Sequence, residues 1–562
     1  MKKIIKNVFF VALSAFALGA CKAELETTPV TTNGKIDLTR YVAVGNSLTA
    51  GFADNGVYLE SQQNSYPLFI SEQFAKAGGG SFIQPLFGSD KPNGSGYIRL
   101  VAGNDAPRLN SPLSLTSAAG TVSVNDCANP TAPKQQYGVD AASTFGFPGS
   151  GGRAFIAYTG TSNQNLGVPG IRVLHTASPL FRAYSIINPF FERLITDTQR
   201  SAGGITYVDY VAASKPTFFT CWLGNNDVLS YATNGGETEG NPNDGGSNSI
   251  TSLPVFTGSY TAVINALTAN GAKGVVATIP DVSALPYFTL VGANRIPRII
   301  IRDNSLAYAT TTSTFASGLP PVPLATGALF PGAGPNPTAQ AIASFINAVY
   351  QNDGFEDPKF VPGENFPVFI VDATTTPKKV RKIDLSGGDY IATGPFTSAN
   401  AGFFAQLTRI NSATCMPATP AQPGGGGLFY TIPNANPLLP PTFVARPLSD
   451  NLILDKDEVV RARTATAGFN NAIKTIAATK GLPVFDAATT FAEIIANSGI
   501  DEVPGTTAVP TGGLFSLDGV HLTPRGYGAI ANQFIKAINA GYNTSIPLLD
   551  VRQRGLRGVR IP

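Results

Sequence analysis

Four short apolar runs, each ended by glycine or a polar residue, constrain the fold of this chain most strongly. They lie at Tyr41–Gly45, Thr217–Leu223, Gly274–Ile279 and Pro483–Ala487. Continuous apolar runs of this length are typical of strands buried on both faces of a parallel sheet. Apolar residues recur with helical spacing at Tyr66–Ala77, Pro189–Thr196, Tyr260–Ala269, Asp455–Gly481 and Pro524–Ala540. Strands that alternate with helices predict an α/β fold with a parallel sheet covered by helices on both faces.

Two long stretches, at about 85–160 and 290–450, interrupt this alternation. They are rich in Gly, Pro, Ser and Asn and have no regular period, apart from a short run at Pro367–Val371 that predicts a strand. Irregular stretches this long in a compact domain usually carry function or a small structure of their own. We interpret them as insertions in a single domain at residues 37–546. Residues 547–562 carry four arginines and are expected to form a solvated C-terminal arm.

Residues 1–20 have the pattern of a secretory signal peptide. Three lysines precede an apolar run at Val8–Ala20, which is too short to span a bilayer comfortably. The run ends in Leu18-Gly19-Ala20-Cys21, which resembles the lipobox of bacterial lipoproteins. That resemblance implies that Cys21 is the mature N-terminus, that its lipid anchors the protein in a membrane, and that residues 21–36 are a tether. The expected location is the periplasmic or surface face of the bacterial outer membrane. The alternative is an ordinary cleaved signal followed by an incidental cysteine.

The charge balance does not point to a nucleic-acid partner. Lys2, Lys3 and Lys6 account for the whole formal charge of +3, so basic and acidic side chains are equal in number from Cys21 onward. A neutral chain has no broad basic surface for nucleic acid.

The remaining cysteines and the histidines argue against a metal site. Cys127 and Cys415 lie in loop-like sequence and are expected to pair, because disulfides are permitted outside the cytoplasm. Cys221 lies in an apolar run and is expected to be buried. With only two histidines, His175 and His521, and no Cys-x-x-Cys, no zinc site is expected.

A serine, a histidine and an aspartate form the candidate catalytic set. Ser47 follows Gly45-Asn46 at the end of the first apolar run, which puts it at the sheet edge where α/β proteins hold their sites. Capping a helix is the ordinary alternative role for such a serine. Asp518 and His521 are three residues apart before a helix that Pro524 can begin. The carboxylate can then hold one ring nitrogen, leaving the other to activate Ser47.

Acyl transfer also requires hydrogen-bond donors aimed at the developing oxyanion. Three candidates are the backbone N–H of Ser47, the backbone N–H of Gly170 and the side-chain amide of Asn226. Glycine at 170 lets the backbone approach a substrate closely. Taken singly, Gly170 and Asn226 are ordinary turn residues, so the prediction depends on their occurring together with Ser47 and His521.

Four motifs in order resemble blocks I, II, III and V of the SGNH (or GDSL) hydrolase family. They are Gly45-Asn46-Ser47-Leu48, Asn165-Leu166-Gly167-Val168-Pro169-Gly170, Gly224-Asn225-Asn226-Asp227 and Asp518-Gly519-Val520-His521. The resemblance implies a three-layer α/β/α fold related to flavodoxin and a cofactor-independent hydrolysis of esters. It implies that Ser47 is the nucleophile, that Asp518 and His521 are the acid–base pair, and that Ser47, Gly170 and Asn226 form the oxyanion hole.

One residue departs from the family pattern. Asn46 stands where the family usually has an aspartate that supports the nucleophile loop. Asn46 is therefore expected to preserve the shape of this loop while changing its charge.

These residues predict a lipid-anchored serine esterase that acts on lipid or short-chain acyl esters. Two alternatives stay open. The chain could be a carbohydrate O-deacetylase of the same fold, or a surface binding lipoprotein on an inactive hydrolase scaffold. In the second alternative the insertions would be the recognition surface.

Overall fold

The computed structural model describes residues 30–101, 153–236, 248–289, 453–501 and 513–558 with single-residue gaps at 161 and 553, and only short segments between these ranges. The signal-peptide and lipidation predictions, including Cys21, lie outside the described residues, as does the Cys127–Cys415 pair. Cys221 is buried, as predicted. No helix in the described ranges has both the length and the hydrophobicity needed to cross a bilayer.

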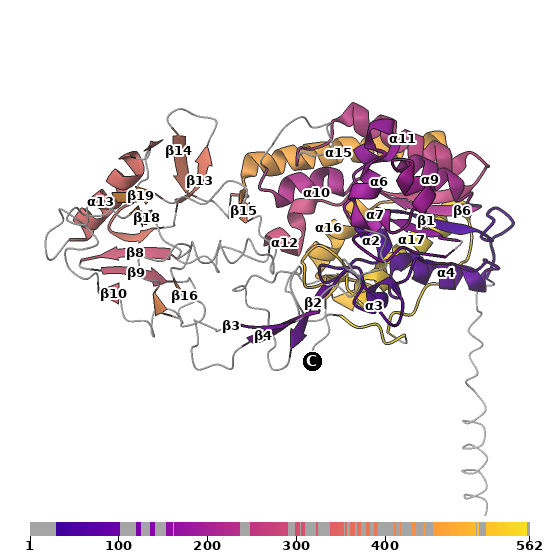
Figure 1. Cartoon of the computed structure of the whole chain (residues 1–562), viewed down its shortest axis with the longest axis horizontal. Helices are drawn as coiled ribbons and strands as arrows, with labels where there is room; N and C mark the ends of the chain where they lie inside the picture. Colours follow the sequence, from indigo (N-terminus) through magenta and orange to yellow (C-terminus); the bar gives the residue numbers. More distant parts are fainter. Residues whose placement is uncertain are drawn as a thin grey trace, which may run out of the picture.

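A five-stranded parallel sheet forms the centre of the molecule (Figure 1). Its strands are β1 (Tyr41–Gly45), β5 (Asn165–Gly167), β6 (Phe218–Trp222), β7 (Lys273–Ala277) and β21 (Val484–Phe485), in the spatial order β21-β7-β6-β1-β5. All four pairings are parallel. The predicted α/β fold with a parallel sheet is confirmed. The chain order reverses at β1, because β5 lies on one side of it and the later strands lie on the other.

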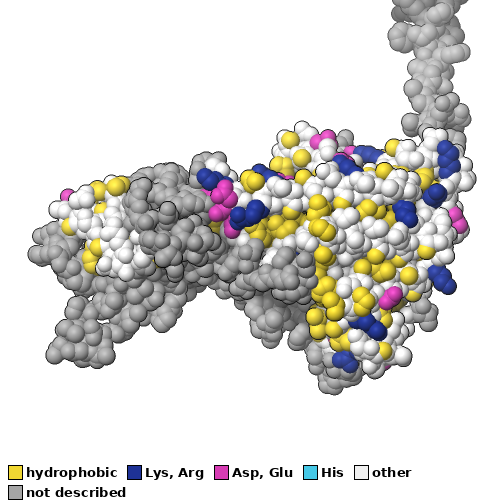
Figure 2. All heavy atoms as spheres, turned by 90° about the horizontal axis from the view of Figure 1, so that it is seen from above, with side chains coloured by type: hydrophobic (Ala, Val, Ile, Leu, Met, Phe, Trp, Pro, Cys, Tyr) yellow, Lys and Arg dark blue, Asp and Glu magenta, His cyan; other side chains and the backbone are white. Residues whose placement is uncertain are grey.

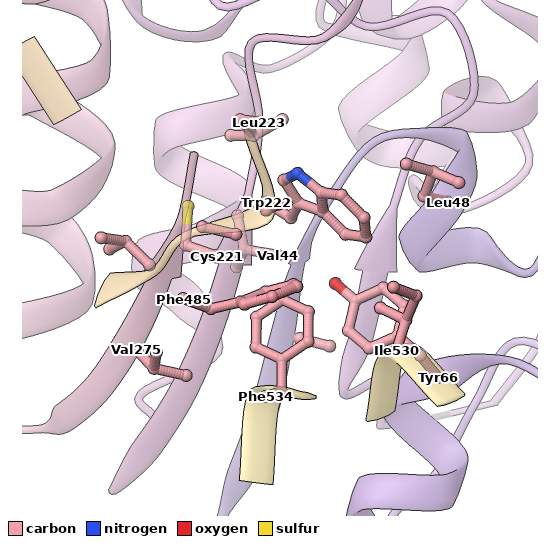
Figure 3. Close-up of a cluster of buried hydrophobic side chains, with 14 of the residues drawn as sticks. Val44, Leu48, Tyr66, Cys221, Trp222, Leu223, Val275, Phe485, Ile530 and Phe534 are labelled. Atoms are coloured by element: carbon pink, nitrogen blue, oxygen red, sulfur yellow. The ribbon is translucent and has the colours of Figure 1, made fainter. Parts of the chain in front are cut away.

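Helices cover both faces of this sheet. Neighbouring residues of one strand contact different helices, because their side chains point to opposite faces. The indole of Trp222 packs against Tyr66 of α4 (Tyr66–Lys76) and Phe534 of α17 (Pro524–Tyr542). Figure 3 shows these rings gathered with Phe485 on one side of the strands. On the other face, the thiol of the preceding residue, Cys221, lies against the hydroxyl of Tyr260 in α11 (Leu253–Thr268).

The long helix α15 (Lys456–Thr479) begins as predicted at Asp455. The Asp455 carboxylate accepts the backbone N–H groups of Asp457 and Glu458, and the Glu458 carboxylate accepts the N–H of Asp455. This reciprocal capping box satisfies donors that a helix start otherwise leaves unpaired. Phe469 of α15 stacks on Phe256 of α11 with ring centroids 4.0 Å apart, which joins the two helices on the same face.

Two predicted helices differ in extent. The helix predicted at Pro189–Thr196 ends after one turn as α7 (Pro189–Glu192), and Thr196 is instead the N-cap of the next helix, α8 (Asp197–Ser201). In contrast, α11 begins seven residues before the predicted start, with Pro254 in its first turn. The remaining short helices of the domain are α2 (Ser47–Ala50), α3 (Leu59–Gln62), α5 (Leu174–Ala177), α6 (Tyr184–Ile187), α9 (Tyr207–Ala213), α10 (Asn226–Thr233), α12 (Pro286–Thr289) and α16 (Ala487–Asn497).

The first long stretch contains an antiparallel sheet of β2 (Tyr97–Val101), β4 (Gln135–Asp140) and β3 (Gly120–Val124), in that order. The second contains α13 (Ala339–Asn352) and the predicted strand, observed as β13 (Val368–Asp372). It also contains the hairpin of β8 (Arg298–Arg302) and β9 (Ser305–Ala309), and β14 (Lys378–Lys382) beside β13. The interpretation of these stretches as irregular is therefore wrong for the parts that are described. In Figure 1 these elements of the second stretch lie apart from the parallel sheet.

The expectation of a solvated C-terminal arm is wrong for its apolar side chains. Leu549, Val551 and Leu556 are buried against α17, where Gly528 leaves room for their side chains. Arg554 forms an ion pair with Glu72 of α4, and Arg557 forms one with Glu60 of α3. On the face of the molecule drawn in Figure 2, basic and acidic side chains are interspersed.

Candidate active site

Three of the four motifs follow neighbouring strands of the parallel sheet. Gly45, the last residue of β1, is in register with Gly167 of β5 on one side and with Trp222 of β6 on the other. Ser47, Gly170 and Asn226 come two to four residues after these positions. Because parallel strands end at the same edge, the three residues lie at the carboxyl edge of the sheet, where the strand order reverses.

Ser47 is the first residue of the short helix α2, and Asn46 is its cap. The Asn46 side-chain oxygen accepts the backbone N–H of Leu48 at 3.1 Å. The alternative of Ser47 as a helix cap is therefore wrong, and its hydroxyl is available for another role. Gly45 is needed just before this turn, because a Cβ there would lie 2.8 Å from the carbonyl oxygen of Trp222.

The fourth motif brings His521 and Asp518 to Ser47. The His521 Nε2 atom lies 2.8 Å from the Ser47 Oγ, and the Nδ1 atom lies 2.9 Å from the Asp518 Oδ2. All three side chains are largely buried. The structure thus brings together the predicted serine, histidine and aspartate, although 474 residues separate His521 from Ser47 in the sequence.

The loop that carries Asp518 and His521 has its own internal support. The backbone N–H of Ser516 donates to the carbonyl oxygen of His521 at 2.8 Å, and Phe515 and Leu522 form an antiparallel bridge. Gly519 has φ of 73°, a left-handed conformation that favours glycine. Thr523 then caps α17 at once, so the loop is held at the start of a 19-residue helix.

Asp518 is held in its ionised form. Burial alone would raise the pKa of this carboxyl. The charge and ring N–H of His521, with the backbone N–H groups of His521 and Val520, outweigh burial and lower the pKa to about 2. A carboxylate in this position fixes the imidazole tautomer and stabilises the imidazolium.

Asn226 and Gly170 meet at the loop that follows β5. The Asn226 Nδ2 atom donates to the carbonyl oxygen of Ile171, next to Gly170, at 2.9 Å. Gly170 has φ of 79° and is exposed, and its carbonyl oxygen accepts the Tyr184 hydroxyl. In the part of the chain that is described, the Gly170 N–H has no protein acceptor.

Two groups at the site were not assigned a role from the sequence. Asp227 is fully buried and accepts the backbone N–H of Val173 at 2.7 Å and the Thr251 hydroxyl at 2.6 Å. Asp227 belongs to the Gly224–Asp227 motif, so the sequence marked its position but not its contacts.

Phe52 packs on the imidazole of His521, with ring centroids 4.4 Å apart. The ring of Phe190 lies next to Phe52, with centroids 6.2 Å apart. The sequence did not mark these two rings as part of the site, where they form an apolar wall beside His521.

His175, the other histidine, is buried and stacks on Tyr184. Among the residues described, no group of three or more His, Cys, Asp or Glu side chains is arranged to hold a metal ion.

Comparisons with family models, curated proteins and solved structures give no match for this chain.

Proposed function

We propose that this chain is a serine esterase of the SGNH type, which hydrolyses carboxylic esters at Ser47. The observation that carries the proposal is the continuous hydrogen-bonded series from the Ser47 hydroxyl through the His521 imidazole to the Asp518 carboxylate. The same order of groups activates serine nucleophiles on unrelated folds, so the geometry supports this chemistry without a likeness to any one protein.

The first step of the proposed reaction is attack by Ser47 on the ester carbonyl. His521 Nε2 takes the hydroxyl proton as the Ser47 oxygen forms its bond to the carbonyl carbon. Ionised Asp518 stabilises the resulting imidazolium through Nδ1. The imidazolium then protonates the departing alcohol as the ester bond breaks. Water, deprotonated by the same ring, attacks the acyl-serine carbonyl. As the bond between the acyl carbon and the Ser47 oxygen breaks, the imidazolium returns the proton to that oxygen and the carboxylic acid leaves.

Three donors are proposed to bind the oxyanion. The N–H of Ser47 belongs to the first turn of α2, whose N–H groups have no intrahelical acceptor. The Gly170 N–H lies on an exposed loop, and Asn226 keeps a second N–H on the amide that binds Ile171. Such preorganised donors act where negative charge develops in the transition state.

The topology supports the SGNH assignment at the level of fold. Numbered along the chain, the five strands have the order 2-1-3-4-5, with helices on both faces. That order is the flavodoxin-like one, and its sites lie where the strand order reverses. The Phe52–Phe190 wall favours substrates with an apolar group next to the ester. The sequence of residues 1–21 leads us to propose an extracytoplasmic protein that is anchored by lipid at Cys21.

The test is Ser47→Ala in the chain beginning at Lys22. We expect this variant to lose hydrolysis of short p-nitrophenyl esters by at least about 10³-fold, while its thermal unfolding stays unchanged. A fluorophosphonate probe should label wild-type Ser47 only. Ser178→Ala, at another helix start, is the matched control and should retain full activity.

The outcomes separate the candidate functions. Wild-type turnover in Ser47→Ala would refute the assignment of the nucleophile. A folded wild-type chain that neither hydrolyses esters nor reacts with the probe would favour a binding protein on an inactive scaffold. Release of acetate from acetylated xylan without hydrolysis of lipid esters would select a carbohydrate deacetylase.

A further inference from the structure

A tight turn just after α2 faces the loop that carries Asp518 and His521. Ala53 and Gly56 exchange two backbone hydrogen bonds of 2.9 Å, and between them Asp54 and Asn55 have φ of 51° and 66°. Two consecutive left-handed residues are the pattern of a type I′ turn, in which Asp and Asn are among the favoured residues. The sequence therefore folds residues 53–56 into a rigid two-residue turn.

This turn binds three consecutive residues of the Asp518 loop. The Asp54 N–H donates to the Ser516 hydroxyl and the Leu517 N–H donates to the Asp54 carboxylate, each at 3.0 Å. The Asn55 N–H donates to the Asp518 Oδ2 at 3.0 Å. That oxygen is the one that contacts His521 Nδ1. The Asp518 carboxylate is thus held from both sides, by its own loop and by the turn.

The residue before the turn contacts the histidine itself. The ring of Phe52 packs on the His521 imidazole. The backbone carbonyl oxygen of Phe52 accepts the Tyr527 hydroxyl of α17 at 2.5 Å. Since Ser47 precedes Phe52 by five residues, the segment Phe52–Asn55 connects the nucleophile to its acid–base pair. Changes in this segment would move Asp518 and His521 relative to Ser47.

Asp54 is the only side chain of the turn with a charge. Its carboxylate accepts the Tyr58 hydroxyl at 2.9 Å as well as the Leu517 N–H. Burial raises the pKa of Asp54 to about 6. The Leu517 N–H opposes this increase and the charge of Asp518 adds to it. The other charged or titratable groups that act on it are Tyr58, Arg557 and Tyr527.

We propose that Asp54 is a positioning residue of the active site, which fixes the Asp518–His521 loop against the nucleophile segment. The inference rests on the proposed function, since it assigns a role in the same reaction. An ionised carboxylate is the stronger acceptor for the Leu517 N–H, so activity should depend on the charge of Asp54 as well as on its hydrogen bonds.

Asp54→Asn tests this role, because it removes the charge and keeps the size and the left-handed conformation. We expect kcat to fall by about 10-fold with KM within about twofold. The pH–rate profile should lose the part that follows ionisation of Asp54, whose pKa is about 6, because asparagine has no carboxyl proton to release. Asp54→Ala should lower kcat further, since it also removes both hydrogen-bond acceptors. Asp501→Asn is the matched control, because Asp501 has φ of 48° and binds Lys536 away from these contacts.

The rate of Ser47 labelling by a fluorophosphonate is measured across the same pH range, with thermal unfolding of each variant. A purely structural role would lower the folded fraction and leave the pH profile of the folded protein unchanged. Labelling with the same rate and pH dependence in wild type and Asp54→Asn would overturn this inference alone. A wild-type chain that is not labelled at Ser47 would overturn the proposed function and this inference together.

Discussion

At the scale of single residues, Asn46 decides how the nucleophile is presented. Its side-chain oxygen caps α2 by accepting the Leu48 N–H. Its amide nitrogen is buried and has no hydrogen-bond partner among the described residues. The loop shape expected from the sequence is present, but one donor of the asparagine is unsatisfied. An aspartate would keep the acceptor and remove that donor.

Replacement of Asn46 separates capping from charge. Asn46→Ala should lower the free energy of unfolding by about 1 kcal/mol and lower kcat, since Ser47 is the next residue. Asn46→Asp should change kcat by no more than about twofold and the free energy of unfolding by no more than about 1 kcal/mol, because helix N-termini favour negative charge. Urea unfolding and ester hydrolysis measure the two effects. An alanine variant equal to wild type in both would show that the cap does not position Ser47.

The residues of the triad could be predicted from the sequence, but the contacts that hold them could not. Ser47, Asp518 and His521 each stand in a recognisable local pattern. The contact between Asn55 and Asp518 uses a backbone N–H and spans 463 residues. Every residue other than proline has such a donor, so nothing in the sequence identifies this one.

At the scale of elements, strand ends and helix caps were predictable where side chains act locally. The capping box at Asp455 and Glu458 is an example. Strand β5 was not predicted, because its three residues, Asn165–Gly167, have no apolar run. Asn165 is buried there and donates to the Thr49 carbonyl oxygen and to Gln84. Tertiary contacts, and not the strand's own composition, therefore determine this element.

Helix α10 holds the loop after β5 through Asp227. Besides Val173 and Thr251, the charge of Arg172 acts on this carboxylate. Burial outweighs these contacts and raises the pKa of Asp227 to about 6 from 3.8. The folded protein therefore holds this proton more tightly than the unfolded chain. The resulting contribution to stability is complete below about pH 4 and is lost as the pH rises through about 6.

Asp227→Asn should change this dependence on pH. The contribution amounts to on the order of 3 kcal/mol between pH 4 and 7, so the variant should lose less stability than wild type over that range. We also expect kcat to fall by about 10- to 100-fold, because the loop with Gly170 is released from α10. Denaturant unfolding at several pH values measures the slope, with the exposed Asp209→Asn as control. Identical slopes in wild type and Asp227→Asn would contradict the assignment.

At the scale of the whole molecule, four of the five strands of the central sheet followed from apolar runs, whereas in the two long stretches only β13 could be predicted. Their strands are short, and several contain charged residues, as in Lys378–Lys382 of β14. Such segments have neither the continuous nor the alternating apolar pattern that indicates a strand. The first stretch is joined to the active-site turn, since Val57 exchanges hydrogen bonds with Ser95. The insertion therefore begins beside the proposed positioning segment.

The C-terminal residues were expected to be solvated because of their arginines. Whether this segment stays on the domain depends on the balance between its apolar contacts and its ion pairs. Leu549, Val551 and Leu556 are each less than 10 % exposed and pack on α17. Burial of one such side chain contributes about 1.5–3 kcal/mol. The ion pairs of Arg554 and Arg557 are about one-third or more exposed, and exposed pairs contribute only about 0–1 kcal/mol each. Apolar packing should therefore hold this segment in place.

Two variants distinguish packing from charge as the basis of this attachment. Leu556→Ala should lower the free energy of unfolding by about 2–4 kcal/mol, because it leaves a cavity beside Gly528. The double variant Arg554→Gln/Arg557→Gln should lower it by no more than about 1 kcal/mol, and the loss should shrink as salt is added. Urea unfolding at low and high salt measures both. A larger loss in the arginine variant than in Leu556→Ala would mean that the ion pairs with α3 and α4, and not apolar burial against α17, hold this segment in place.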